Sequence, residues 1–142
     1  MPVLDPDAPV LLIRLDNNEL TSIPVEIGDL SRLLVFGVER NQLTSVPTQL
    51  GHLPNLRVLR LAANQLTSIP MTLNGLDSLQ TLTLSNNQLT GNIALPLVGL
   101  IDTLTSITIA DGTGGNDCLT SSDPAVTAFL NANAEDWDLC EN

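Results

Sequence analysis

The chain is 142 residues long, which is the size of one domain and enough to bury a substantial core. Its 16 acidic residues outnumber 5 basic residues, all of them arginine, and the formal net charge of −11 excludes nucleic acids and anionic membrane surfaces as partners, since both are polyanions. Hydrophobic residues make up 43% of the composition but include only two Phe, one Trp and no Tyr, which indicates a core built by repeating aliphatic positions.

Residues 1–9, MPVLDPDAP, form the predicted N-terminal edge segment. They lack the basic and apolar regions of a signal peptide, so either the protein is cytosolic or a signal has been removed. Their prolines and aspartates can blunt the open edge of a sheet, because proline cannot donate a hydrogen bond to a strand ladder. A fragment of a longer chain and pairing with another copy are the alternatives for this end. No apolar run in the sequence reaches the roughly 18 residues needed to span a bilayer.

From residue 10 onward the sequence repeats with a period of 23 residues, following the pattern L-x-x-L-x-L-x-x-N-x-L. The alternation at L-x-L predicts a short strand in each unit. Because one unit cannot bury its leucines alone, the units must stack. The four regular units are marked by Val10, Ile13, Leu15, Asn18 and Leu20; Leu33, Phe36, Val38, Asn41 and Leu43; Leu56, Leu59, Leu61, Asn64 and Leu66; and Leu79, Leu82, Leu84, Asn87 and Leu89.

Two further positions shape the chain after each strand. The asparagine stands where the chain leaves the strand, and its side chain can satisfy backbone groups there. The return segments of the first three units contain proline, which stops a helix, so they should be irregular or contain only short helical turns. The predicted structural ladder comprises Asn18, Asn41, Asn64 and Asn87.

These in-register units resemble the leucine-rich repeat superfamily, of the 23-residue type. The resemblance covers about residues 10–112 and implies an α/β solenoid, curved and right-handed, with short parallel strands on the concave face and the rest of each unit on the convex side. A fifth, degenerate unit follows at Leu104, Ile107 and Ile109, with Gly112 in the place of the asparagine. The segment GNIALPLVGLIDTL absorbs two additional residues of the fourth unit.

In this family, ligands dock on the concave sheet at the variable positions of the pattern. Unit one contributes Leu11, Arg14, Asp16 and Asn17, and the other units contribute the equivalent positions. Four of the five arginines fall on this face, and arginine binds carboxylates in a bidentate manner. The candidate ligand-binding residues are Arg14, Asp16, Glu39, Arg40, Arg57, Arg60, Thr83 and Ser85.

Two interpretations of these arginines stay open. Pairing with the carboxylates of the same face is favoured for Arg14 and Arg40, because such pairs are common across strands. A ligand site is favoured for Arg57 and Arg60, whose own unit offers alanines as neighbours. An acidic peptide or an anionic sugar suits such a site, and the absence of aromatic residues from the face favours a protein or peptide over a sugar.

Residues 113–142 form the predicted C-terminal cap, which a solenoid needs because its last unit otherwise exposes core leucines. In the segment SDPAVTAFLNAN, Asp123 and Pro124 are of the types preferred at the N-cap and at the first position of a helix. The predicted apolar side of this cap comprises Val126, Phe129, Leu130, Trp137 and Leu139.

The segment DGTGGND, residues 111–117, precedes this helix. We interpret it as a turn and not as a calcium site, because it lacks the residue order and the distal Glu of an EF-hand. Cys118 and Cys140 bracket the helix, and this placement favours a structural disulfide over two free thiols. The segment also resembles the C-terminal caps of secreted bacterial leucine-rich repeat proteins, which implies a secreted or surface-exposed protein whose signal has been removed.

The sequence contains no recognisable catalytic set. Its single histidine, His52, lies in a return segment, and no metal-binding or nucleotide-binding motif is present. A column of threonines after the asparagines is interpreted as turn chemistry and not as an ice-binding surface. We therefore predict a non-enzymatic protein–protein interaction module without cofactor or metal. A structural or adhesive repeat module, a fragment of a longer repeat protein and a polysaccharide-binding module are the alternatives.

Overall fold

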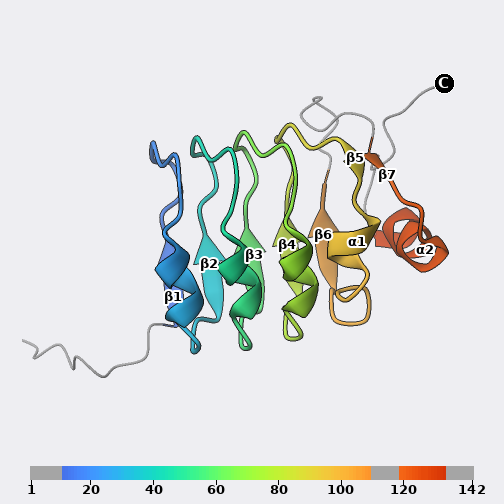
Figure 1. Cartoon of the computed structure of the whole chain (residues 1–142), viewed down its shortest axis with the longest axis horizontal. Helices are drawn as coiled ribbons and strands as arrows, with labels where there is room; N and C mark the ends of the chain where they lie inside the picture. Colours follow the sequence, from blue (N-terminus) through green and yellow to red (C-terminus); the bar gives the residue numbers. More distant parts are fainter. Residues whose placement is uncertain (1–10, 110–118, 134–142) are drawn as a thin grey trace, which may run out of the picture.

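The computed structural model describes residues 11–109 and 119–133. It shows a solenoid in which each repeat unit adds one strand to a single parallel sheet (Figure 1). The predicted solenoid with parallel strands is confirmed, and the last strand lies in the segment assigned to the degenerate fifth unit. The strand order is β1 (Leu12–Arg14), β2 (Val35–Gly37), β3 (Val58–Arg60), β4 (Thr81–Thr83) and β6 (Ser106–Thr108).

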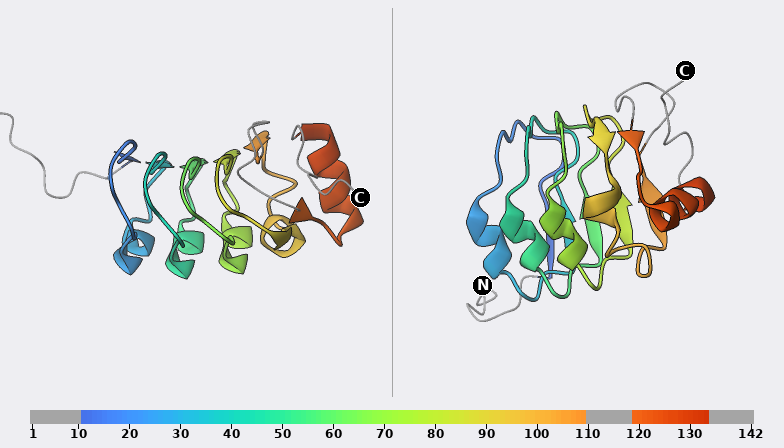
Figure 2. Two further views of the ribbon diagram at one scale, coloured as in Figure 1. Left: turned by 90° about the horizontal axis from the view of Figure 1, so that it is seen from above. Right: turned by 45° about the vertical axis from the view of Figure 1, so that its right-hand side comes forward.

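Short helices form the side of the solenoid opposite to the sheet (Figure 2). The 3₁₀ helices η1 (Val25–Asp29), η2 (Thr48–His52) and η3 (Met71–Gly75) each begin directly after the proline of their unit. Proline is tolerated at a helix start because it has no N–H group to leave unpaired there. In the fourth unit, the chain instead forms β5 (Gly91–Asn92) and the short α-helix α1 (Ala94–Leu97).

The core lies between the sheet and the helices and is almost wholly aliphatic. The mid-strand residues of neighbouring units lie side by side in register, and from the second unit onward they are buried. Phe36, 1% exposed, is the one aromatic residue among the described side chains that are fully buried. Each fully buried leucine of such a column stabilises the fold by roughly 1.5–3 kcal/mol relative to an exposed one.

Buried asparagines bind each unit to the one before it. Asn64 accepts a hydrogen bond from the N–H of Leu43 (3.0 Å) and donates to the carbonyl oxygens of Val38 (3.0 Å) and Leu61 (3.1 Å). The ladder asparagines of the second and fourth units make the equivalent bonds. One side chain therefore satisfies backbone groups of two units at once.

The two ends of the solenoid differ. At the C-terminal end, α2 (Pro124–Asn133) lies over the last unit, as Figure 1 shows. The carboxylate of Asp123 accepts hydrogen bonds from two backbone N–H groups of its first turn (2.8 and 3.1 Å), while Val126 and Leu130 are buried. The predicted capping helix is thus confirmed. The strand that precedes α2 in the chain, β7 (Leu119–Thr120), pairs in parallel with β5.

At the N-terminal end, unit one is only partly covered. Leu11, Leu12 and Leu15 are 46%, 52% and 43% exposed, and an apolar cavity of about 380 Å³ opens between this unit and the next. Asn18 is exposed and, within residues 11–109 and 119–133, donates only to carbonyl oxygens of its own unit, at distances of 3.0 and 3.2 Å. Among these residues, the first ladder asparagine therefore has no bonds like those that join its equivalents to a preceding unit.

Several predicted features lie outside the described residues. They are the edge segment 1–9, the DGTGGND turn, and Cys118, Trp137, Leu139 and Cys140. Of the helices that the structure describes, none has the length and apolarity needed to cross a membrane.

Candidate functional site

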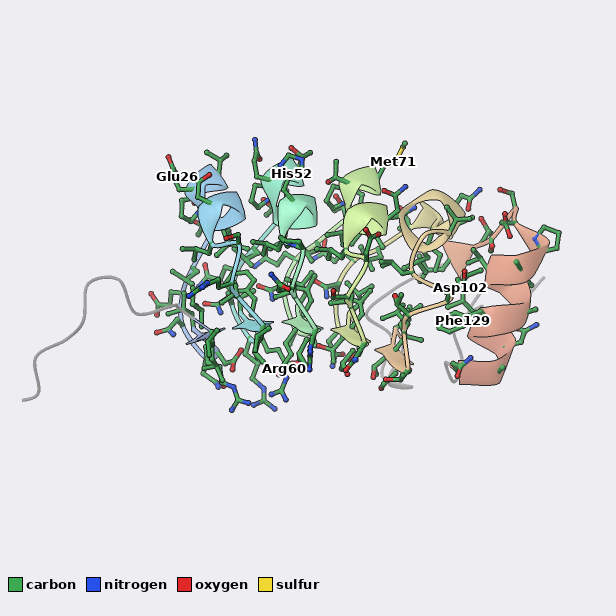
Figure 3. The ribbon with its side chains drawn as sticks, turned by 90° about the horizontal axis from the view of Figure 1, so that it is seen from below. Glu26, His52, Arg60, Met71, Asp102 and Phe129 are labelled. Carbon is green, nitrogen blue, oxygen red and sulfur yellow. The ribbon has the colours of Figure 1, made fainter. Side chains whose placement is uncertain are left out.

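The exposed face of the sheet consists of parallel rows of side chains. Within each strand the middle residue points to the core, so the residues before and after it face away from the core. Figure 3 shows Arg60 pointing away from the side that carries Glu26, His52 and Met71. One row across the sheet, set by the strand register, comprises Arg14, Gly37, Arg60, Thr83 and Thr108.

A second row of this face was missing from the sequence prediction. Each of its residues stands directly before the buried mid-strand residue, so strict alternation, applied to the whole strand, identifies it. The row is apolar over the first three units and hydroxyl-bearing over the last two. It comprises Leu12, Val35, Val58, Thr81 and Ser106.

Four arginines were assigned to this face from the sequence, and we call Arg14, Arg40, Arg57 and Arg60 the cationic patch. Strand register places Arg14 and Arg60 on the exposed face of the sheet. Arg14, Arg40 and Arg57 are exposed and Arg60 is half-buried. Within the described part of the chain, none of their guanidinium groups makes an ion pair or a hydrogen bond. The internal pairing favoured for Arg14 and Arg40 is therefore not found there, and all four cations face solvent.

The carboxylate of Asp16 is held by the backbone instead of an arginine. Its Oδ1 atom accepts a hydrogen bond from the N–H of Glu39 at 2.8 Å. Gly37 makes this possible, because a Cβ atom on Gly37 would lie 3.0 Å from the same oxygen. The missing side chain in unit two thus leaves room for the Asp16 carboxylate over the strand.

Glu39 makes a longer connection across the same face. Its Oε1 atom accepts a hydrogen bond from the hydroxyl of Thr83 at 2.7 Å, although the two residues are 44 positions apart. The bond joins the second unit to the fourth and passes over the third, where Ala62 occupies the position equivalent to Glu39. Both carboxylates near the cationic patch are consequently engaged in internal hydrogen bonds.

The residue directly before each ladder asparagine adopts a left-handed backbone conformation, with φ between 54° and 59°. Asn17 and Asn86 tolerate this conformation better than other non-glycine residues, whereas Arg40 and Ala63 are strained there. The turn directs the chain out of the sheet at the edge of the concave face. Arg40 therefore belongs to the border of the cationic patch and not to its centre.

The two halves of the concave face differ in chemistry. Over units one to three, four arginines and two carboxylates give a local charge of +2 beside an apolar row. Over the last two units the described side chains are uncharged, and Thr105 donates to a backbone carbonyl oxygen at 3.1 Å. Ser85 is only 8% exposed and offers little surface to a ligand. No group of His, Cys, Asp and Glu residues suited to a metal occurs among the described residues.

A parallel sheet of short strands, backed by short helices, defines a repeat solenoid with one exposed sheet face. The family model described as leucine rich repeat matches residues 11–66 and 31–89, which together span more than half of the chain. The chain therefore belongs to the leucine-rich repeat family. No curated protein matches it in sequence.

Two solved structures are similar to this chain. A leucine-rich repeat protein of Leptospira interrogans is 30% identical, with a TM-score of 0.66, over 79% of this chain and 27% of its own. The leucine-rich repeat ectodomain of the receptor kinase SOBIR1 of Arabidopsis thaliana is also 30% identical, with a TM-score of 0.63, over 86% of this chain and 62% of its own. The chain thus spans less than two thirds of either protein.

Proposed function

We propose that this domain is a non-enzymatic binding module whose concave sheet, over units one to three, engages an acidic protein or peptide. The leucine-rich repeat fold is a common protein–protein interaction module. The site residues that we propose for the partner are the cationic patch and the apolar row beside it, at Leu12, Val35 and Val58.

The observation that carries this proposal is that the four arginines of the cationic patch have no carboxylate partner among the described residues. In a chain of net charge −11, four of five basic residues occupy repeat positions assigned to one face. Guanidinium groups are weakly hydrated and bind carboxylates with two parallel hydrogen bonds, so they suit protein interfaces. Acidic segments are attracted to this patch, while the overall negative charge repels large polyanions.

The experiment compares two charge reversals that change the net charge equally. Arg57→Glu changes an exposed arginine directly before β3 that we assign to the concave face, and Arg32→Glu changes an exposed arginine in a turn away from the proposed site. Proteins captured from a surface-protein extract by the wild-type domain are identified, purified and titrated with each variant. We expect Arg57→Glu to weaken binding at least about tenfold and Arg32→Glu to leave it unchanged.

Equal affinity of both variants would contradict a concave site. Absence of any partner would favour the alternatives of a structural or adhesive repeat module or a fragment of a longer repeat protein. Capture of a glycan in place of a protein would favour the polysaccharide-binding alternative.

We also propose that the module is secreted or surface-exposed and that a Cys118–Cys140 disulfide closes its cap. The ectodomain character of one similar structure supports this location. In the chain-entropy model a bridge over this loop stabilises the fold by about 3 kcal/mol. Thiol alkylation of the unreduced, denatured protein should add no mass, and alkylation after reduction should label both cysteines. Labelling without reductant would show free thiols.

A further inference from the structure

The side chain of Glu39 crosses the middle of the concave face. It starts in unit two, and its carboxylate accepts the hydrogen bond of the Thr83 hydroxyl in unit four at 2.7 Å. The alanine at the equivalent position of unit three, Ala62, leaves this path open. The backbone N–H of Glu39 donates a separate hydrogen bond to the Asp16 carboxylate. The Glu39 side chain can therefore move while its backbone keeps this bond.

Arg60 lies directly beside Thr83, whose hydroxyl binds the Glu39 carboxylate. Strand register places Arg60 between Gly37 on one side and Thr83 on the other. Adjacent strands are about 4.8 Å apart, so the guanidinium of Arg60 and the hydroxyl of Thr83 can reach one common anion. Arg60 nevertheless makes no ion pair with Glu39 or with any other described residue. One cation and one hydroxyl donor are thus adjacent, but only the hydroxyl is engaged.

We propose that Arg60 and Thr83 together form a binding site for one carboxylate of the partner, and that Glu39 occupies the Thr83 side of this site in the free protein. This inference rests on the proposed function, since it assigns the centre of the same face. An incoming carboxylate takes the Thr83 hydrogen bond and pairs with Arg60, while the Glu39 side chain moves into solvent. Glu39 is therefore an internal competitor that reduces binding of single carboxylates and favours partners with several contacts.

The alternative is a purely structural role, in which the Glu39–Thr83 bond holds three units together and has no part in recognition. The two roles differ in their response to removal of the carboxylate. If the role is structural, removing the Glu39 carboxylate gives a less stable domain with unchanged affinity for anions. If Glu39 competes with the partner, its removal raises the affinity for acidic peptides, because the Thr83 hydroxyl becomes available and a like charge disappears.

The test titrates a hexaglutamate peptide into isotopically labelled domain, followed by amide and arginine side-chain NMR signals, with hexaglutamine as the neutral probe. The variants are Glu39→Ala, Thr83→Val and the double variant. Glu26→Ala removes the same charge from the opposite side and is the matched control (Figure 3). We expect Glu39→Ala to tighten hexaglutamate binding about tenfold, the size of one charge-assisted hydrogen bond, with shifts centred on Arg60 and Thr83.

The double variant should lose this gain, and Glu26→Ala should not show it. No gain in Glu39→Ala, no binding by any variant, or a gain that survives Thr83→Val would each overturn the inference. The spectra also report folding, so a collapsed variant is recognised. Failure here leaves the proposed function standing if Arg57→Glu still abolishes partner capture. A gain here together with equal capture by Arg57→Glu and Arg32→Glu would instead contradict the proposed partner surface and leave only a carboxylate-binding site at Arg60 and Thr83.

Discussion

The two ends of the solenoid carry the same repeat chemistry with different consequences. At the C-terminal end, α2 buries Val126 and Leu130 against the last unit. At the N-terminal end, Leu15 remains 43% exposed, although its equivalents Val38 and Leu61 are 0% exposed. A repeat residue therefore contributes to stability through its neighbours on both sides and not through the motif alone, as expected for a nearly one-dimensional stack.

The largest expected effect compares two ladder residues with identical motif positions. Asn64→Ala leaves the N–H of Leu43 without a partner in the core, while the carbonyl oxygens of Val38 and Leu61 each lose one of two hydrogen bonds. The unsatisfied N–H costs about 1–3 kcal/mol and each lost carbonyl bond about 0.5–1.5 kcal/mol, so we expect a loss of about 4 kcal/mol in the free energy of unfolding. Asn18→Ala, at the open end, should cost less than about 1 kcal/mol. Urea denaturation of both variants measures this difference, and similar losses would contradict the role assigned to neighbours.

The next effect compares leucines at the two ends. Leu130 is 0% exposed and Leu15, a core position of the repeat, is 43% exposed. Leu130→Ala uncovers the last unit and should cost about 3 kcal/mol, within the range for buried leucines. Leu15→Ala should cost about 1 kcal/mol, because much of its side chain is already hydrated. Thermal unfolding followed by circular dichroism provides the comparison. A large loss at Leu15 would show that this side chain is covered in solution.

A smaller effect concerns the helix that closes the C-terminal end. The Asp123 carboxylate accepts two hydrogen bonds from the first turn of α2. Asp123→Ala should lower the free energy of unfolding by about 1 kcal/mol, and Asp123→Asn should retain most of it because an amide oxygen also caps. Hydrogen exchange of the α2 amides localises the change. Equal losses in both variants would indicate that charge, and not capping geometry, stabilises the helix.

Local patterns predicted most of this fold. The L-x-L alternation locates every strand of the sheet, because this signal depends only on neighbouring residues. The prolines were interpreted as stopping a helix, whereas η1, η2 and η3 each begin directly after one, as the short helical turns that the return segments allow. The Asp-Pro pair likewise locates the start of α2. The open end was less predictable, since the exposure of Leu15 depends on what lies beside unit one and not on its own sequence.

The sequence proposes a candidate site but gives no information on its side-chain pairing. The strand register places Arg60 on the exposed face of the sheet, yet it does not identify side-chain partners. The Glu39–Thr83 bond joins residues 44 positions apart and depends on a small residue in the unit between them. Likewise, the Asp16 carboxylate lies over Gly37 because that residue has no side chain. Such contacts arise from three-dimensional stacking, so a motif cannot specify them.

The smallest expected effect is a gain in stability within the stack. Ala63 has a φ of 55°, a left-handed conformation that its Cβ atom disfavours, whereas Asn17 and Asn86 hold the same position elsewhere in the ladder. Ala63→Gly removes the strain, but it also increases the conformational freedom of the unfolded chain. We therefore expect a net gain of only about 0.5 kcal/mol in the free energy of unfolding, and a similar gain for Ala63→Asn. Differential scanning calorimetry resolves such a gain. A loss in both variants would show that the methyl group of Ala63 packs usefully, and that the neighbours of this position outweigh its backbone strain.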